Sequence, residues 1–158
     1  MTSEVHDTAY HRLRAQDQRY TANRRQIVDL LTSSTNPLSL PELLELANGS
    51  LVQSSAYRNL SVLEEAGVVR RLAVGDFARF ELAEDLTEHH HHLICDSCHR
   101  VTDYRVPADL EASLEHAFVA IAQQTGFRPD HHRLDLIGTC SECGHRPGAD
   151  TGTGLAPA

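Results

Sequence analysis

The sequence lacks the long apolar segments that are typical of membrane proteins. No apolar run approaches the ~18 residues that suggest a membrane span, and the N-terminal stretch MTSEVHDTAYHRLRAQ is polar, without an apolar signal core. We therefore expect a cytoplasmic protein with no membrane partner. At 158 residues, 41% of them hydrophobic, the chain has the length of one globular domain or two small ones.

Motifs of catalysis are absent as well. The sequence has no HExxH motif and no serine or cysteine in the context of a nucleophile. We therefore expect that the protein is not an enzyme. Two alternatives from other classes are a zinc hydrolase, in which histidines and a glutamate activate water, and a zinc-binding buffer.

Positive charge is scarce and unevenly placed. The net charge is −8, yet residues 1–80 carry nine arginines and nine acidic residues, whereas residues 81–158 carry five arginines and 13 acidic residues. Residues 10–25 hold five of the arginines against Asp17 alone, which indicates a phosphate-facing patch, the alternative being a solvated helix face. The second half, with nine of the 11 histidines at or after position 89, suits a cation-binding domain.

The first half has the pattern of a winged helix-turn-helix. Apolar spacing predicts helices over residues 21–31 and 41–47, then a third helix to about residue 66 with Ser54 or Ser55 as its cap. The segments VVRRLAV and FARFEL predict two strands around a turn. In such a domain the third helix enters the DNA major groove and the wing touches the backbone. An interaction or structural module is the alternative.

The second half predicts a small α/β domain. The segments HHHHLIC, VTDYRV and HRLDLIGTC are expected to be strands, and a helix is expected from Pro107 to near Gly126. The residues from Gly148 onward show no periodicity and predict a disordered tail.

Four cysteines form two CxxC pairs, a spacing that lets turn residues bind one tetrahedral zinc through sulfur. In a cytoplasmic chain such cysteines favour metal or redox chemistry over disulfides. Four sulfur ligands leave no open coordination position, so we expect a structural zinc rather than a catalytic one. The ligands would be Cys95, Cys98, Cys140 and Cys143.

Four consecutive histidines, residues 89–92, precede the first cysteine pair. If they lie in a strand, their side chains alternate between its two faces. One face would carry a regulatory metal site of two imidazoles and two carboxylates, suited to zinc and tolerable for iron(II), manganese or nickel. We call Glu81, His90, His92 and Asp103 the regulatory set.

The other face of the histidine run predicts a possible additional metal site. Its carboxylate would come from Glu111, with Glu115 one helical turn on as the substitute, and its third histidine would be His132 or His131. Solvated surface histidines are the alternative for this face. We call His89, His91, Glu111 and His132 the additional set.

Together these segments resemble the ferric-uptake-regulator family of metal-sensing repressors. RYTANRRQIVDLL is similar to the family's first winged-helix segment, SSAYRNLSVLEEAGVV to its recognition helix, and HHHHLICDSC with HHRLDLIGTCSEC to its dimerisation domain. The resemblance implies a homodimer that represses transcription by binding a palindromic operator when metal-loaded. It also implies that the four cysteines, the regulatory set and the additional set are metal ligands, that Tyr57 and Arg58 contact DNA, and that Arg19 is a basic residue that reaches DNA.

The resulting prediction is an α+β protein with an N-terminal winged helix-turn-helix and a C-terminal α/β dimerisation domain that contains a three-stranded sheet. We expect a winged-helix domain over residues 1–82, a hinge over 83–88, a metal-binding dimerisation domain over 89–146 and a disordered tail over 147–158.

Departures from the family pattern favour zinc as the sensed metal. Many members supply a further regulatory histidine before the second helix, but the stretch TNPLSLPEL has none here. A run of four histidines, where iron-type members commonly place an aspartate third, points the same way, although the cysteine that some zinc sensors carry near the hinge is absent. We therefore expect a zinc-loaded repressor of zinc-homeostasis genes, most similar to the zinc-uptake-regulator branch; an iron-responsive or other divalent-metal regulator is the alternative.

Overall fold

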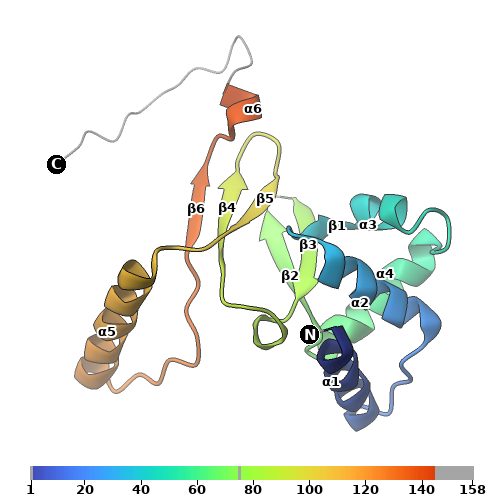
Figure 1. The fold of residues 1–158 in the computed structure, drawn as a ribbon, viewed down its shortest axis with the longest axis horizontal. Helices are drawn as coiled ribbons and strands as arrows, with labels where there is room; N and C mark the ends of the chain where they lie inside the picture. The colour runs from blue at the N-terminus through green and yellow to red at the C-terminus, as the bar shows by residue number, and fades with distance from the viewer. Residues whose placement is uncertain (1, 75, 145–158) are drawn as a thin grey trace. The chain divides into compact units, whose positions relative to one another are not determined.

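The computed structural model describes residues 2–74 and 76–144 and divides the chain into two compact units, Met1–His90 and His91–Ala158 (Figure 1). The first unit contains α1 (Thr2–Ala15), α2 (Ala22–Ser33), β1 (Leu38–Ser39), α3 (Leu40–Leu46), α4 (Gln53–Glu65), β2 (Val69–Val74), β3 (Phe77–Leu82) and the 3-10 helix η1 (Glu84–Leu86). The second unit contains β4 (His91–Cys95), β5 (Val101–Tyr104), α5 (Ala108–Thr125), β6 (Asp135–Gly138) and α6 (Ser141–Gly144).

The first unit is the predicted winged helix-turn-helix. Its strands form an antiparallel sheet in the order β1-β3-β2, in which Arg70 lies opposite Glu81. Ala56, Leu60 and Leu63 recur at helical spacing along α4, and each is at most 1% exposed, so their predicted inward orientation is confirmed.

Local chemistry explains where these helices begin. At α3, the Ser39 hydroxyl accepts from the Glu42 amide and the Glu42 carboxylate accepts from the Ser39 amide, a reciprocal capping box. The prediction that Ser54 or Ser55 caps α4 is wrong, because the N-cap is Val52, without a side-chain hydrogen bond. The Ser55 hydroxyl instead accepts from Asn23 of α2.

Three elements of the first unit were not predicted: α1, β1 and η1. Helix α1 was missed because its polar sequence carries little periodic signal, although Val5, Ala9 and Leu13 pack into the core. The two-residue strand β1 is too short for a pattern to reveal. The predicted hinge over residues 83–88 includes η1, and its role as a hinge stays a prediction.

The second unit confirms the predicted three-stranded sheet and its helix. The order is β5-β4-β6, with β4 antiparallel to β5 and parallel to β6. Helix α5 ends at Gly126, whose φ of 71° is the left-handed conformation that glycine adopts most readily. The strands are shorter than expected, and β4 begins at His91, so His89 and His90 precede it.

The predicted tail over 147–158 lies outside the described residues. None of the helices in the described part of the chain has the length and apolar composition that crossing a membrane requires.

Candidate metal centres

The four cysteines converge at one end of the second unit's sheet. Cys95 ends β4, Cys98 lies in the following turn, Cys140 follows β6, and Cys143 lies in α6. All four sulfurs lie within 4.8 Å of one another. The Cys98 and Cys140 sulfurs are 3.8 Å apart, which matches the edge of a zinc–sulfur tetrahedron with bonds of about 2.3 Å and is too long for a disulfide.

The backbone around this site favours thiolate at Cys95. Burial opposes ionisation, but hydrogen bonds from the backbone amides of Cys140, Cys98 and Ser97 outweigh it and lower the pKa of Cys95 to about 6. Hydrogen bonding to Cys140, burial and the other neighbouring sulfurs raise the pKa of Cys143 to about 12. Four thiolates this close together would repel one another unless a cation lay between them. A zinc ion bound by all four sulfurs would supply that positive charge.

The first pair of the regulatory set lies in the first unit. Glu81 on β3 is 8% exposed, and its Oε2 is 3.5 Å from His90 Nε2. His90 Nδ1 donates to the Glu88 carbonyl at 2.8 Å. Because that hydrogen bond places the ring proton on Nδ1, Nε2 carries the lone pair that a metal needs.

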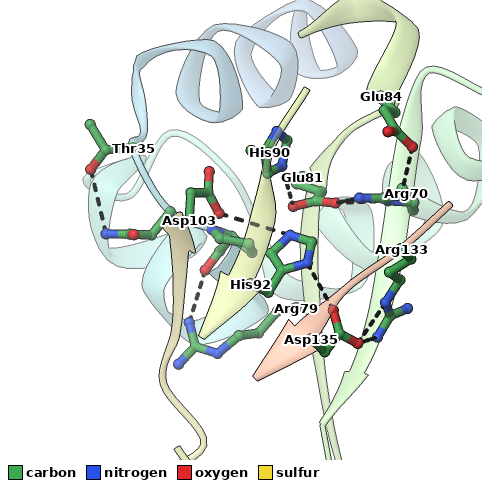
Figure 2. Close-up of polar contacts among 12 residues, drawn as sticks. Thr35, Arg70, Arg79, Glu81, Glu84, His90, His92, Asp103, Arg133 and Asp135 are labelled. Carbon is green, nitrogen blue, oxygen red and sulfur yellow. Dashed lines mark hydrogen bonds and ion pairs between the residues drawn. The ribbon is translucent and has the colours of Figure 1, made fainter. Parts of the chain in front are cut away.

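The second pair lies in the second unit. His92 and Asp103 are opposite each other in the β4–β5 register, and His92 Nε2 is 3.9 Å from Asp103 Oδ1. His92 is 1% exposed and donates from Nδ1 to Asp135 at 3.3 Å (Figure 2). Each pair therefore consists of one imidazole and one carboxylate.

Sequence reasoning missed the residues that support these pairs. Asp135 orients His92 from β6; burial opposes its ionisation, but hydrogen bonds and charge from Arg133 and His92 lower its pKa. Arg70 binds both Glu81 and Glu84 (Figure 2). The alternation in HRLDLIG marks a strand but does not say that the strand lies beside β4, so the sequence carried no signal for Asp135.

Three members of the additional set meet in the second unit. The Glu111 carboxylate bridges two rings, with His91 Nε2 and His132 Nε2 each 2.9 Å from one of its oxygens. The substitutes Glu115 and His131 line a neighbouring cavity with Phe118 and Phe127. The fourth member, His89, belongs to the first unit, where its Nδ1 is 2.7 Å from Glu84.

The predicted DNA-contacting residues lie on the surface of the first unit. Tyr57 is 57% exposed on the outer face of α4, and with Arg58 it lines an open hollow between α3 and α4. Arg19 is exposed in the loop before α2.

The predicted basic patch is partly structural. Arg12 binds the Gly67 carbonyl and Asp85, and Arg24 binds Asn59 of α4. Arg14 and Arg19 are exposed.

Comparison with known proteins places these features in context. The sequence model of the ferric uptake regulator family matches residues 15–137. The chain is 32% identical over 129 residues to the peroxide operon regulator of Bacillus subtilis (strain 168), a match that covers 79% of this chain and 83% of that protein.

Solved structures are similar over most of the chain. The ferric uptake regulator Fur of Helicobacter pylori, described as having three functional metal-binding sites, has a TM-score of 0.72 and 21% identity and covers 91% of this chain and 94% of its own. A zinc-bound manganese uptake regulator has a TM-score of 0.61 and 31% identity and covers 86% of this chain and 98% of its own.

Proposed function

The chain belongs to the ferric uptake regulator family, and within that family we propose that it is a repressor that binds a palindromic operator when its regulatory set is loaded with zinc. The coarser description follows from the family itself: a metal-dependent transcriptional repressor, not an enzyme, with a four-cysteine site of the zinc type and a histidine and carboxylate site. The family binds operator DNA as a dimer.

The observation that carries the proposal is the division of the regulatory set. Glu81 and His90 form one pair in the wing-bearing unit, and His92 and Asp103 form the other in the second unit. Two imidazoles and two carboxylates, with no further histidine from the stretch before α3, suit a four-coordinate zinc. When bound, a divalent cation supplies one positive charge centre that all four ligands share.

The chain's own residues give that binding a consequence for DNA. Glu81 is continuous with the wing through β3, and His92 is fixed within the second unit's sheet by Asp135. Joining the two pairs would restrict the position of α4 in each protomer. A dimer reads half-sites about 34 Å apart only when its two recognition helices have the matching separation, so metal and DNA affinities become reciprocally coupled.

The four cysteines and the additional set have separate proposed roles. We assign a structural zinc to Cys95, Cys98, Cys140 and Cys143, because four sulfurs leave no position for exchange. Glu111, with His91, His132 and His89, would hold a further cation. The proposed target genes are those of zinc homeostasis, since zinc is the metal that the regulatory set favours.

The similarity to a peroxide operon regulator supports a second candidate. Iron(II) or manganese at the same four ligands would make the protein responsive to iron or to oxidants instead of zinc.

One experiment tests both candidates. Operator DNA would be selected from a random library with the zinc-loaded dimer, and its affinity measured over buffered series of zinc, iron(II) and manganese. We expect zinc to induce binding, and His90→Ala and Glu81→Ala to abolish that response while retaining the four-cysteine zinc and the dimer. Variants that respond to zinc as wild type does would overturn the regulatory assignment, and a response to iron(II) alone would overturn the choice of metal.

A further inference from the structure

Arg70 lies at the centre of the polar network around the histidine run. It pairs directly with Glu81 across strands β2 and β3, so the two side chains lie on the same face of the sheet. Arg70 Nε and Nη2 are 2.7 and 2.5 Å from Glu81 Oε1. The side chain of Arg70 is 25% exposed and that of Glu81 is 9% exposed, so this ion pair is largely shielded from solvent.

This contact uses one carboxylate oxygen and leaves the other directed at His90. Two N–H groups of Arg70 meet Oε1, whereas Oε2 lies 3.5 Å from His90 Nε2 (Figure 2). A guanidinium binds carboxylates in a fixed planar geometry, so it restricts rotation of the Glu81 head group. Arg70 therefore presents Oε2 beside the ring nitrogen that carries the lone pair.

The guanidinium of Arg70 is also linked to the additional set, through Glu84. Arg70 Nη1 is 3.4 Å from Glu84 Oε2, and Glu84 Oε1 is 2.7 Å from His89 Nδ1. The carboxylate accepts the Nδ1 proton of His89, which leaves its Nε2 for a metal. One arginine thus contacts a ligand of the regulatory set and the carboxylate that orients a ligand of the additional set.

We propose that Arg70 is a positioning residue for both histidine sets: it fixes the Glu81 carboxylate beside His90 and, through Glu84, the ring of His89. This inference rests on the proposed metal-binding function of those sets. It adds a residue that touches no metal itself and acts through Glu81 and Glu84.

Charge and orientation make opposite predictions about its loss. If Arg70 acted only as a nearby positive charge, its removal would strengthen cation binding, because a repulsive charge would disappear. If it acts by positioning, its removal weakens binding, since outer-shell partners of metal ligands typically contribute 10–100-fold in affinity.

The chain offers a matched control at the next residue. Arg71 follows Arg70 on β2 but is exposed, so Arg71→Gln removes the same charge without touching Glu81 or Glu84. Arg70→Lys keeps the charge and loses the planar guanidinium, and Glu84→Ala removes the carboxylate that lies between Arg70 and His89. Thermal unfolding of each variant would verify that it folds.

Zinc affinity would be measured on the full-length dimer by competition with chelators of graded strength, with the four-cysteine zinc counted by elemental analysis. Cobalt(II) absorption would report the geometry of each set. We expect Arg70→Gln and Arg70→Lys to weaken zinc binding at the regulatory set by about 10–100-fold and Arg71→Gln to leave it unchanged. We expect Glu84→Ala to weaken zinc binding at the additional set only.

The outcomes separate this inference from the function on which it rests. Unchanged or tighter zinc binding in Arg70→Gln, or wild-type affinity in Arg70→Lys, would overturn the positioning role while the loss of binding in His90→Ala still supported the site. If His90→Ala also bound zinc at the regulatory set as wild type does, the proposed function would fail first.

Discussion

The two units bury different kinds of side chain. In the first unit, apolar side chains from α1 to β3 form one buried cluster that includes the fully buried Leu13, Ile27, Leu60 and Leu63. In the described part of the second unit, the buried side chains are His91, His92, Ile94, Cys95, Val101 and Cys143, most of which have metal-binding atoms.

Helix α5 sharpens this contrast. Within the chain it buries none of its 18 residues, and Leu110, Val119 and Ile121 are each about half exposed. An amphipathic or apolar helix normally gains its stability by burying a face. The first unit thus carries its own apolar core, whereas in the second unit the proposed metal ions and the proposed dimer would supply the stabilisation that its few buried side chains do not.

The largest expected effect comes from removing one cysteine. Cys95→Ser or Cys140→Ser should unfold the second unit, because structural zinc contributes an apparent ~10–16 kcal/mol in zinc-finger peptides and that binding energy is folding energy. Hydrogen exchange should show lost protection in β4 and β6 and retained protection in α2 and α4. Ser97→Ala in the same turn is the control, and a stable, zinc-free dimer from either cysteine variant would contradict the structural assignment.

The second prediction concerns a substitution in the apolar core of the first unit. Leu60→Ala should lower the free energy of unfolding of the first unit by about 2–5 kcal/mol, since it leaves a cavity among well-packed side chains. Zinc content should stay that of wild type. Chemical denaturation checks this, with the exposed Leu46→Ala as control; equal losses in the two variants would show that α4 is not the centre of this core.

The side chains that contact DNA should all come from the first unit. Arg58→Ala should weaken operator binding by about 1–3 kcal/mol if Arg58 contacts a base edge, whereas Arg19→Ala should weaken binding to all sequences and reduce the salt slope by about one. Arg105→Ala, an exposed arginine of the second unit, is the control. Fluorescence anisotropy on operator and random DNA would measure each, and equal losses on both DNAs for Arg58→Ala would remove its role in base recognition.

The smallest expected effect is a pH dependence confined to the first unit. Burial opposes ionisation of Glu42, but hydrogen bonds from Ser39 and the charge of Arg79 lower its pKa. The ionised carboxylate therefore contributes stability above its unfolded pKa of about 4.3, and this contribution is lost as pH falls through the lower folded value.

Glu42→Gln should remove this acid-dependent contribution to the free energy of unfolding. We expect the contribution to be less than about 1 kcal/mol, because the side chain is partly exposed and its charge is screened. Hydrogen exchange in α3, measured from about pH 3 to about pH 6, would monitor its unfolding across the unperturbed glutamate pKa of about 4.3. The same slope in wild type and Glu42→Gln would assign the acid sensitivity to another group.

Sequence patterns predicted the elements whose burial follows a period. The inward face of α4 was evident because Ala56, Leu60 and Leu63 repeat at helical spacing, and Gly126 marked the end of α5. Helix α1 gave no such signal, since only Val5, Ala9 and Leu13 face the core from an otherwise polar segment.

The candidate sites divide in the same way. Spacing alone singled out the cysteine pairs and the histidine run, whose members the structure brings close to the expected partners within each unit. Arg70, Glu84 and Asp135 escaped notice because their roles come from strand register and from contacts with side chains elsewhere in the chain. The pairing of β4 with β6 joins strands that are far apart in the sequence, so no local pattern encodes the contact of Asp135 with His92.

The contact between Cys98 and Cys140 also has a consequence for the order of folding. These sulfurs are 42 residues apart in sequence, and the parallel pairing of β4 with β6 requires the whole of α5 between them. During synthesis the first unit is complete, and the local pair Cys95 and Cys98 is available, well before Cys140 emerges. Because non-local pairings form slowly, we expect a newly made chain to pass through a stage with a folded winged helix and a half-liganded zinc. Cellular zinc supply would then limit how quickly new repressor matures, in addition to how much of it binds DNA.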